Sequence, residues 1–169
     1  MQRVAILGNG GAGKSELARE IARRTGLPVI HLDVLFWRRG WTPAPPEEFL
    51  RDLGAAIAGE RWILDGNFLS AEQDAPRFDR VDTVIFLDLP RTTCFRCALW
   101  RLVRDRRRRR SDLAEDCSEG FDLDFLRWIW RYSRDDRPQV LQMLDGLNGR
   151  AVVRHLRSRS DVRRYVSTL

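Results

Sequence analysis

The stretch Gly8-Asn9-Gly10-Gly11-Ala12-Gly13-Lys14-Ser15 decides the fold that the sequence predicts. It lies between an apolar run, residues 4–7, and a helical pattern over residues 14–25. The spacing G-x-x-x-x-G-K-[ST] between a strand and a helix is that of a phosphate-binding loop. Glycines let backbone amides turn inward around phosphate oxygens, and the helix N-terminus adds partial positive charge. The alternative is a glycine-rich turn that only caps a helix.

This loop implies a nucleotide and a metal ion. Lys14 is the only lysine of the chain, and every other cationic side chain is arginine. A compact ammonium suits the β- and γ-phosphates of ATP, and the Ser15 hydroxyl suits Mg²⁺. We therefore expect ATP and Mg²⁺ as cofactors. The predicted nucleotide-binding residues are Gly8, Gly10, Gly11, Ala12, Gly13, Lys14, Ser15 and Glu16.

Length and composition favour one soluble domain. The chain has 169 residues, 43% hydrophobic and 32% charged, which suits a single domain over residues 1–169. No stretch approaches the roughly 20 apolar residues of a membrane span, and we expect no signal peptide. Three cysteines, Cys94, Cys97 and Cys117, favour a reducing cytoplasm over a disulfide scaffold. The net charge of +6 suits polyanionic partners, nucleotides and nucleic acids alike.

Strands and helices alternate along the chain. Apolar runs predict strands at residues 3–7, 29–32, 62–64, 83–87 and 151–153. Helices are predicted at residues 14–25, 47–58, 92–110, 121–134, 139–147 and 161–166. This alternation predicts a three-layer α/β/α fold with a five-stranded parallel sheet. Ligands bind at the carboxyl ends of such strands, where Asp33, Asp65 and Asp88 are expected.

Several segments together resemble a known kinase family. They are residues 8–15, 31–37, 62–68, 86–91, 127–130 and 137–138. The chain resembles nucleoside-monophosphate-kinase-like P-loop proteins, and more closely the adenylate-kinase-like bacterial proteins named DNA topology modulation proteins. The resemblance implies a P-loop NTPase fold of the nucleotide-kinase type, with an acceptor-binding flap at about 33–60 and a helical lid at about 101–137. It also implies that Asp65, with Ser15, helps to hold Mg²⁺.

The acceptor side departs from the adenylate-kinase pattern. Adenylate kinases follow Asp-Gly with Phe-Pro-Arg, whereas this chain continues with Asn67 and phenylalanine. The acceptor-phosphate arginine is therefore missing there, and Arg77, Arg80 or Arg91 could supply its charge. Asp33 is predicted as a base for an acceptor hydroxyl, as another acceptor contact or as a turn cap.

Aromatic and arginine-rich segments flank these positions. Phe36, Trp37 and Trp41 predict either a stacking surface for a nucleobase or part of the core. In the predicted lid, arginines at 101, 104 and 106–110 would offset charge on the transferring phosphoryl group. A solvated charged helix and a nucleic-acid patch are the alternatives. Structural roles are expected for His31, Cys94 and Cys97. The predicted catalytic residues are Lys14, Asp33, Arg104, Arg108 and Arg137.

Three functions are compatible with these residues. The first is a kinase that transfers the γ-phosphoryl group of ATP to a small acceptor, a (deoxy)nucleoside monophosphate. The second transfers it to a hydroxyl group, with Asp33 as the base. The third is an NTP-dependent DNA-binding protein acting through the arginine run, which the acidic residues of segment 112–124 disfavour. A monomer or homodimer without membrane association suits each function.

Overall fold

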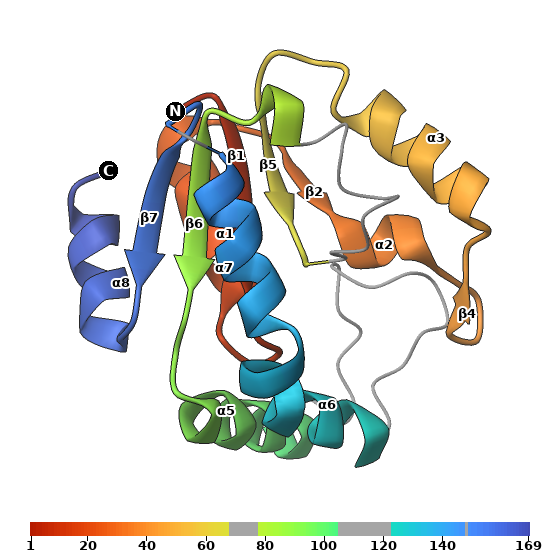
Figure 1. Ribbon diagram of the computed structural model, residues 1–169, viewed down its shortest axis with the longest axis vertical. Helices are drawn as coiled ribbons and strands as arrows, with labels where there is room; N and C mark the ends of the chain where they lie inside the picture. The colour runs from red at the N-terminus through yellow and green to blue at the C-terminus, as the bar shows by residue number, and fades with distance from the viewer. Residues whose placement is uncertain (68–77, 105–122, 148) are drawn as a thin grey trace.

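The computed structural model describes residues 1–67, 78–104, 123–147 and 149–169. Five parallel strands form the central sheet, in the order β2-β5-β1-β6-β7. All their carboxyl ends therefore lie at one edge of the sheet, which is the lower edge in Figure 1. The strands are β1 (Arg3–Gly8), β2 (Val29–His31), β5 (Trp62–Asp65), β6 (Thr83–Leu87) and β7 (Val152–Leu156).

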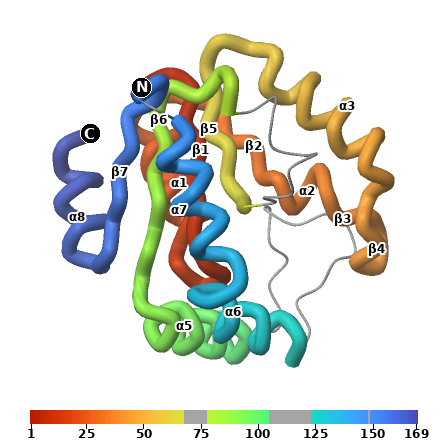
Figure 2. Tube along the Cα trace, viewed as in Figure 1, coloured from red at the N-terminus to blue at the C-terminus, as the bar shows by residue number. Residues whose placement is uncertain are grey.

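Helices cover both faces of the sheet, as Figures 1 and 2 show. One face packs against α3 and α7, and the other packs against α1 and α8. Helices α5 and α6 lie across the carboxyl end of the sheet (Figure 2). The bounds are α1 (Lys14–Thr25), α3 (Pro46–Ala56), α5 (Arg91–Arg104), α6 (Leu123–Asp135), α7 (Arg137–Gly146) and α8 (Arg159–Ser167).

The alternation of side chains along β1 explains the three layers. Ala5 and Leu7 belong to the core under α3 and α7, whereas Val4 and Ile6 belong to the core over α1. Because successive strand residues point to opposite faces, a strand buried on both sides reads as one continuous apolar run. The predicted three-layer α/β/α fold with five parallel strands is confirmed.

The segment after β2 differs from the prediction. The predicted strand 29–32 ends at His31, and α2 (Leu32–Phe36) begins at the next residue. Asp33 therefore lies in the first turn of a helix, where a carboxylate is favourable, and not at a strand end. A short apolar run does not by itself distinguish a strand from a buried helical turn.

The aromatic segment that follows α2 is also more regular than expected. It forms a hairpin of β3 (Trp37–Arg38) and β4 (Thr42–Pro43). Arg38 fastens the hairpin to α3, because its guanidinium donates to the carboxylates of Asp52 at 3.1 Å and Glu48 at 3.4 Å. The predicted flap therefore contains α2, the hairpin and α3, in that order.

Other predicted elements are present with shifted ends. The last strand runs to Leu156 instead of residue 153, and α5 is described as far as Arg104. Residues 105–110 of the predicted helix 92–110 lie outside the described residues. Among the helices that the structure describes, none combines the length and the apolar character needed to span a membrane.

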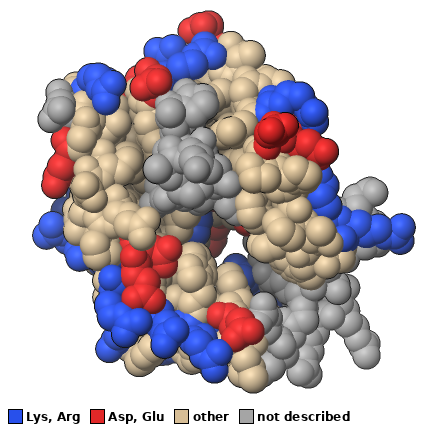
Figure 3. Space-filling model, turned by 45° about the vertical axis from the view of Figure 1, so that its right-hand side comes forward, with Lys and Arg blue, Asp and Glu red and all other residues tan. Residues whose placement is uncertain are grey.

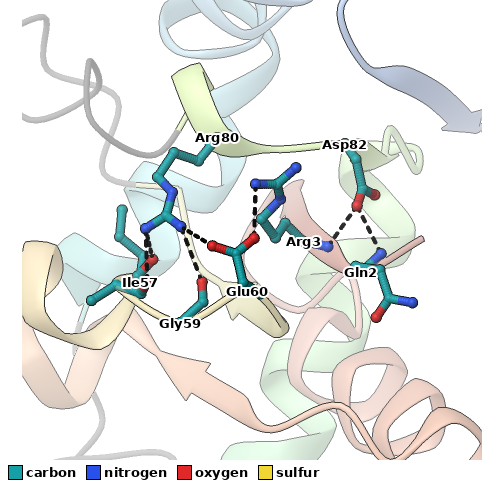
Figure 4. Close-up of polar contacts among 8 residues, drawn as sticks. Gln2, Arg3, Ile57, Gly59, Glu60, Arg80 and Asp82 are labelled. Atoms are coloured by element: carbon teal, nitrogen blue, oxygen red, sulfur yellow. Dashed lines mark hydrogen bonds and ion pairs between the residues drawn. The ribbon is translucent and has the colours of Figure 1, made fainter.

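Charged residues at the amino ends of the strands pair with one another (Figure 4). The Arg80 guanidinium donates to the backbone carbonyls at residues 57–59, where α3 ends, and to the Glu60 carboxylate at 3.1 Å. Glu60 also pairs with Arg3 at 3.5 Å. The Asp82 carboxylate accepts hydrogen bonds from the backbone N–H groups of Gln2 at 2.8 Å and Arg3 at 2.9 Å. This network closes the edge of the sheet opposite the phosphate-binding loop.

Candidate nucleotide-binding site

The loop between β1 and α1 forms a cradle that only glycine can build at several positions. Gly8, Gly11 and Gly13 have φ angles of 148°, 75° and 93°, in a region that other residues rarely adopt. A Cβ atom on Gly8 would lie 2.6 Å from the Leu87 carbonyl oxygen, and one on Gly11 would collide with the Cys94 carbonyl. The loop is therefore closely packed against the end of β6 and against α5.

Helix α6 closes the third side of this cradle. A Cβ atom on Gly10 would lie 2.8 Å from Ile129 and 2.9 Å from Trp128. The Asn9 side chain, which is 2% exposed, donates from Nδ2 to the Ile129 carbonyl at 2.9 Å. Sequence reasoning missed this contact, because the two residues are 120 positions apart and no local pattern connects them.

Lys14 lies at the centre of the charged groups of the site. Its Nζ donates to the carbonyls of Gly8 at 2.9 Å and Asn9 at 3.1 Å. Burial lowers the pKa of Lys14, and the negative charges of Asp65 and Asp33 act in the opposite direction. Both carboxylates therefore act electrostatically on the ammonium group, and their roles in binding metal and acceptor stay predictions.

Arg101 joins the same group of charges. Its positive charge contributes to the lowering of the Lys14 pKa, after the larger effect of burial. Arg101 is therefore a predicted lid arginine whose charge acts on the lysine of the phosphate-binding loop. Arg104 lies with its guanidinium 4.3 Å from the centre of the Trp100 ring, which is 61% exposed. Arg108 lies outside the described residues.

Asp65 provides a buried carboxylate at the end of β5. It is 4% exposed, and its Oδ2 lies 2.8 Å from Nδ1 of His31, its register partner on β2. His31 thus has the structural role that the sequence predicted. The Asp65 carboxylate and the Ser15 hydroxyl are hard oxygen donors of the kind that Mg²⁺ prefers.

The donor set fits an ion held mainly by a bound nucleotide. Mg²⁺ in phosphate-transfer sites is usually bound through one or two protein oxygens, substrate phosphates and water. Within the described ranges, no three or more His, Cys, Asp or Glu side chains gather into a site that would hold a metal alone. Ser15 and Asp65 therefore suit Mg²⁺ only together with phosphate.

The predicted flap faces this edge of the sheet from the side of α2. Asp33 is partly buried there, and the aromatic rings that follow it pack edge to face. The Phe36 ring centre lies 5.5 Å from that of Phe49 in the core, whereas Trp41 is 40% exposed and 5.5 Å from Trp37. Phe36 thus packs with the core, whereas the two tryptophans lie further out, and their stacking on a ligand stays a prediction.

The surface of the molecule is hollowed beside these elements. Figure 3 shows an opening near the centre of the face, with basic and acidic side chains both visible inside it. A nucleotide and its metal ion need both signs of charge, because phosphates attract cations and the metal attracts carboxylates. The hollow therefore has the mixed charge that such a ligand requires.

The arginines proposed for an acceptor phosphate have other positions. The suggestion for Arg80 was wrong, because it is bound to the end of α3 at the opposite edge of the sheet. Arg91 lies with its guanidinium 4.5 Å from the centre of the Trp130 ring. Arg77 lies outside the described residues. Of these three arginines, the structure thus excludes Arg80, and a role for Arg91 stays a prediction.

Arg137 is held by Asp88 at the carboxyl end of β6. Its Nε and Nη2 donate to the two Asp88 carboxylate oxygens, each at 2.8 Å, and His155 Nε2 lies 2.8 Å from Asp88 Oδ2. Burial alone would raise the pKa of Asp88, but the hydrogen bonds from Arg137 and His155 outweigh it and lower the pKa. The structure thus places Arg137 in an ion pair, and its contact with phosphate stays a prediction.

Of the two cysteines in α5, Cys94 has the position expected of a core thiol and Cys97 does not. Cys94 is fully buried, and burial raises its pKa to about 11. Cys97 is partly buried, next to the guanidinium of Arg159. Neither thiol has the partners of a zinc site among the described residues. Cys117 lies outside them.

Comparison with known proteins identifies the fold. The sequence matches no known family model and no curated protein. An unliganded sugar kinase from Janibacter sp. HTCC2649 matches over 99% of this chain and 93% of that chain, with 18% identity and a TM-score of 0.53. A gluconokinase from Sinorhizobium meliloti 1021 matches over 99% and 94%, with 14% identity and a TM-score of 0.55.

The chain shares the fold of these kinases. At these identities the likeness concerns the fold, so the residues of the site carry the functional argument. The narrower resemblance to adenylate-kinase-like DNA topology modulation proteins stays a prediction from sequence.

Proposed function

We propose that the protein is an ATP- and Mg²⁺-dependent kinase that phosphorylates a hydroxyl group of a small acceptor. The observation that carries this proposal is that the Lys14 ammonium donates to the loop carbonyls of Gly8 and Asn9, while the negative charges of Asp65 and Asp33 act on it. We assign the Asp65 carboxylate to the metal and the Asp33 carboxylate to the acceptor. Both structural neighbours are kinases, which supports the same class of reaction.

The donor half of the site consists of the loop and its lysine. Backbone amides of the cradle and the N-terminus of α1 would bind the phosphates of ATP, and Lys14 would bind the β- and γ-phosphates. Ser15 and Asp65 would hold Mg²⁺, which supplies positive charge to the phosphate oxygens when it is bound. Arg101 adds a second cation close to Lys14, so it suits the charge that spreads over the transferring phosphoryl group.

The acceptor half is built around Asp33. The acceptor oxygen forms a bond to the γ-phosphorus, the bond from that phosphorus to the β–γ bridging oxygen breaks, and ADP leaves. The hydroxyl proton passes to the Asp33 carboxylate as the new bond forms. A phosphate acceptor would be ionised already and would need a binding arginine instead of a base. Arg80 is committed to the opposite edge of the sheet, which favours the hydroxyl acceptor.

The structural neighbours suggest the class of acceptor. These neighbours are a sugar kinase and a gluconokinase, so we propose a sugar or sugar acid as the acceptor of this protein as well. The partly exposed Trp41 offers an aromatic face to either a sugar ring or a nucleobase. A nucleoside monophosphate is therefore the rival acceptor that the test must include. Cytoplasmic location and a monomeric or homodimeric state remain expectations from sequence.

A coupled assay of ADP release tests this proposal. Purified protein with ATP and Mg²⁺ is offered sugars, sugar acids, nucleosides and nucleoside monophosphates in parallel. We expect turnover with a hydroxyl acceptor and a loss of kcat of roughly 100-fold or more in Asp33→Asn. Asp145→Asn, an exposed carboxylate change on α7, is the matched control and should leave kcat unchanged.

The acceptor panel also distinguishes the rival functions. Turnover with nucleoside monophosphates alone, together with a small effect of Asp33→Asn, would assign the acceptor phosphate instead. No turnover with any acceptor, combined with duplex DNA binding that weakens steeply with salt, would support the DNA-binding alternative.

A further inference from the structure

The Asn67 side chain makes a double hydrogen bond with the first residue of the phosphate-binding loop. Its Oδ1 accepts from the Gly8 N–H at 2.9 Å, and its Nδ2 donates to the Gly8 carbonyl at 2.7 Å. One side-chain amide therefore holds both backbone polar groups of a single residue. The two residues are 59 positions apart, so no motif of the sequence predicts the contact.

The contact continues the sheet beyond the end of a strand. Backbone pairing between β1 and β5 ends at Ile6 and Asp65, whereas β1 itself continues to Gly8. After Asp65 the chain turns at Gly66, which has a φ of 140° and donates its N–H to the Ile6 carbonyl at 3.3 Å. The Asn67 amide then bonds to Gly8 as the next residue of a longer strand would.

Glycine is required at the turn that delivers Asn67. A Cβ atom on Gly66 would lie 2.8 Å from the Cβ atom of Leu32, which is fully buried at the start of α2. The position of the Asn67 amide is thus fixed by close packing on one side and by the loop on the other.

The Gly8 carbonyl also determines where Lys14 points. It accepts from Lys14 Nζ at 2.9 Å, and the Asn9 carbonyl accepts from the same Nζ at 3.1 Å. An ammonium group has three N–H donors, and these two bonds use two of them. The direction of the third donor therefore depends on the orientation of the Gly8 carbonyl. The Asn67 amide donates to the same carbonyl and so helps to hold it in place.

We propose that Asn67 is a positioning residue for Lys14, acting through the Gly8 carbonyl. The inference rests on the proposed function, in which the Lys14 ammonium binds the phosphates of ATP. Asn67 affects the nucleotide by fixing the carbonyl that orients the ammonium, and not by contact with phosphate. Without the Asn67 amide, the Gly8 N–H loses the Asn67 oxygen and the Gly8 carbonyl loses the Asn67 N–H, so the carbonyl that accepts from Lys14 is held less firmly.

A double-mutant cycle tests whether Asn67 acts through Lys14. The dissociation constant of Mg²⁺–ATP is measured by calorimetry for wild type, Asn67→Ala, Lys14→Met and the double variant. We expect roughly 10-fold weaker binding in Asn67→Ala and roughly 100-fold in Lys14→Met. The double variant should match Lys14→Met, because a positioning residue has no effect once the group it positions is absent.

A matched control separates this effect from the general loss of a side-chain amide. Gln139 Nε2 donates to the Asp135 carbonyl at 3.2 Å on the exposed surface of α7. Gln139→Ala should therefore leave the affinity for ATP unchanged. Effects of Asn67→Ala and Lys14→Met that multiply in the double variant would overturn the inference.

Amide exchange supplies a readout that needs no nucleotide. We expect the Gly8 amide proton to exchange roughly 10-fold faster in Asn67→Ala, because its acceptor is gone. Asn67→Asp keeps an acceptor oxygen and so should keep this proton protected, yet it should weaken ATP binding because it no longer donates to the Gly8 carbonyl. An unchanged exchange rate of the Gly8 amide in Asn67→Ala would overturn the positioning role of Asn67 and leave the proposed function standing. A wild-type protein that binds no ATP would instead overturn the proposed function.

Discussion

The two ends of the central sheet carry similar residues in different arrangements. At the amino end, Arg3 and Arg80 both pair with Glu60, and Arg80 also donates to backbone carbonyls, so these charges have partners within the protein (Figure 4). At the carboxyl end, the negative charge of Asp65 acts on the Lys14 ammonium, which donates to the carbonyls of a glycine loop packed against β6, α5 and α6. Charged residues thus stabilise the fold at one end, and at the other we propose that they bind a ligand.

This difference shows why residue type alone does not identify a site. An arginine that follows a strand looks the same in sequence whether it binds a helix end or a phosphate. The arrangement separates the two roles, because a structural arginine has protein partners for most of its donors. The predictions below change one residue at each end and compare stability with nucleotide binding.

The largest contrast is expected between two glycine substitutions. Gly11→Ala places a Cβ atom against the Cys94 carbonyl at a φ of 75°, so we expect a loss of about 3 kcal/mol in the free energy of unfolding and no ATP binding. Gly54→Ala, in α3, meets nothing within 4 Å and should stabilise the protein by about 0.5–1 kcal/mol. Chemical denaturation and calorimetry measure both. Equal stability in the two variants would contradict the packed cradle.

A smaller contrast is expected between two arginines. Arg80→Ala removes the bonds that close the end of α3, so it should lower the free energy of unfolding by about 2 kcal/mol and leave kcat unchanged. Arg101→Ala should lower kcat roughly 10-fold or more, because Arg101 adds positive charge next to Lys14. Its stability should stay within about 1 kcal/mol of wild type. The reverse pattern would mean that the functional end of the sheet has been misassigned.

The smallest effect is expected for the ion pair between Asp88 and Arg137. It lies at the carboxyl end of the sheet, but like the network at the amino end it joins protein groups to one another. Because the folded pKa of Asp88 is below its usual 3.8, its contribution to stability is present above that pH and is lost as the pH falls through the folded pKa. Asp88→Asn should cost about 1–2 kcal/mol at pH 7.

The pH dependence distinguishes this ion pair from simple packing. We expect the difference between wild type and Asp88→Asn in urea denaturation to stay constant from pH 7 to about pH 5 and to shrink below pH 4. A difference that does not change down to pH 3 would show that the charge of Asp88 contributes nothing.

The sequence was sufficient to predict the features that depend on local spacing. The loop from Gly8 to Ser15 has a fixed spacing, and each buried strand forms a continuous apolar run, so both were predicted correctly. The position of Asp65 at the same edge as the loop followed, because parallel strands bring their carboxyl ends to one edge. Asp33 lies in helix α2, which the apolar run at residues 29–32 did not distinguish from a strand.

The sequence was not sufficient for contacts between side-chain amides and distant backbone groups. Asn67 and Asn9 bond to backbone at positions that have no periodic relation to them. Their geometry depends on how strand β5 and helix α6 approach the loop, which the pattern of either segment alone does not contain. The same reason explains Arg80, whose partners at the end of α3 became visible only in the folded chain.

Calorimetry of Mg²⁺–ATP with the purified wild type is the most direct test of the central claim, that the glycine cradle and Lys14 bind a magnesium nucleotide. We predict a dissociation constant of roughly 1 μM to 1 mM, in the range usual for enzyme substrates, and much weaker binding in Lys14→Met. Absence of binding for both ATP and GTP in the folded wild type would contradict the account.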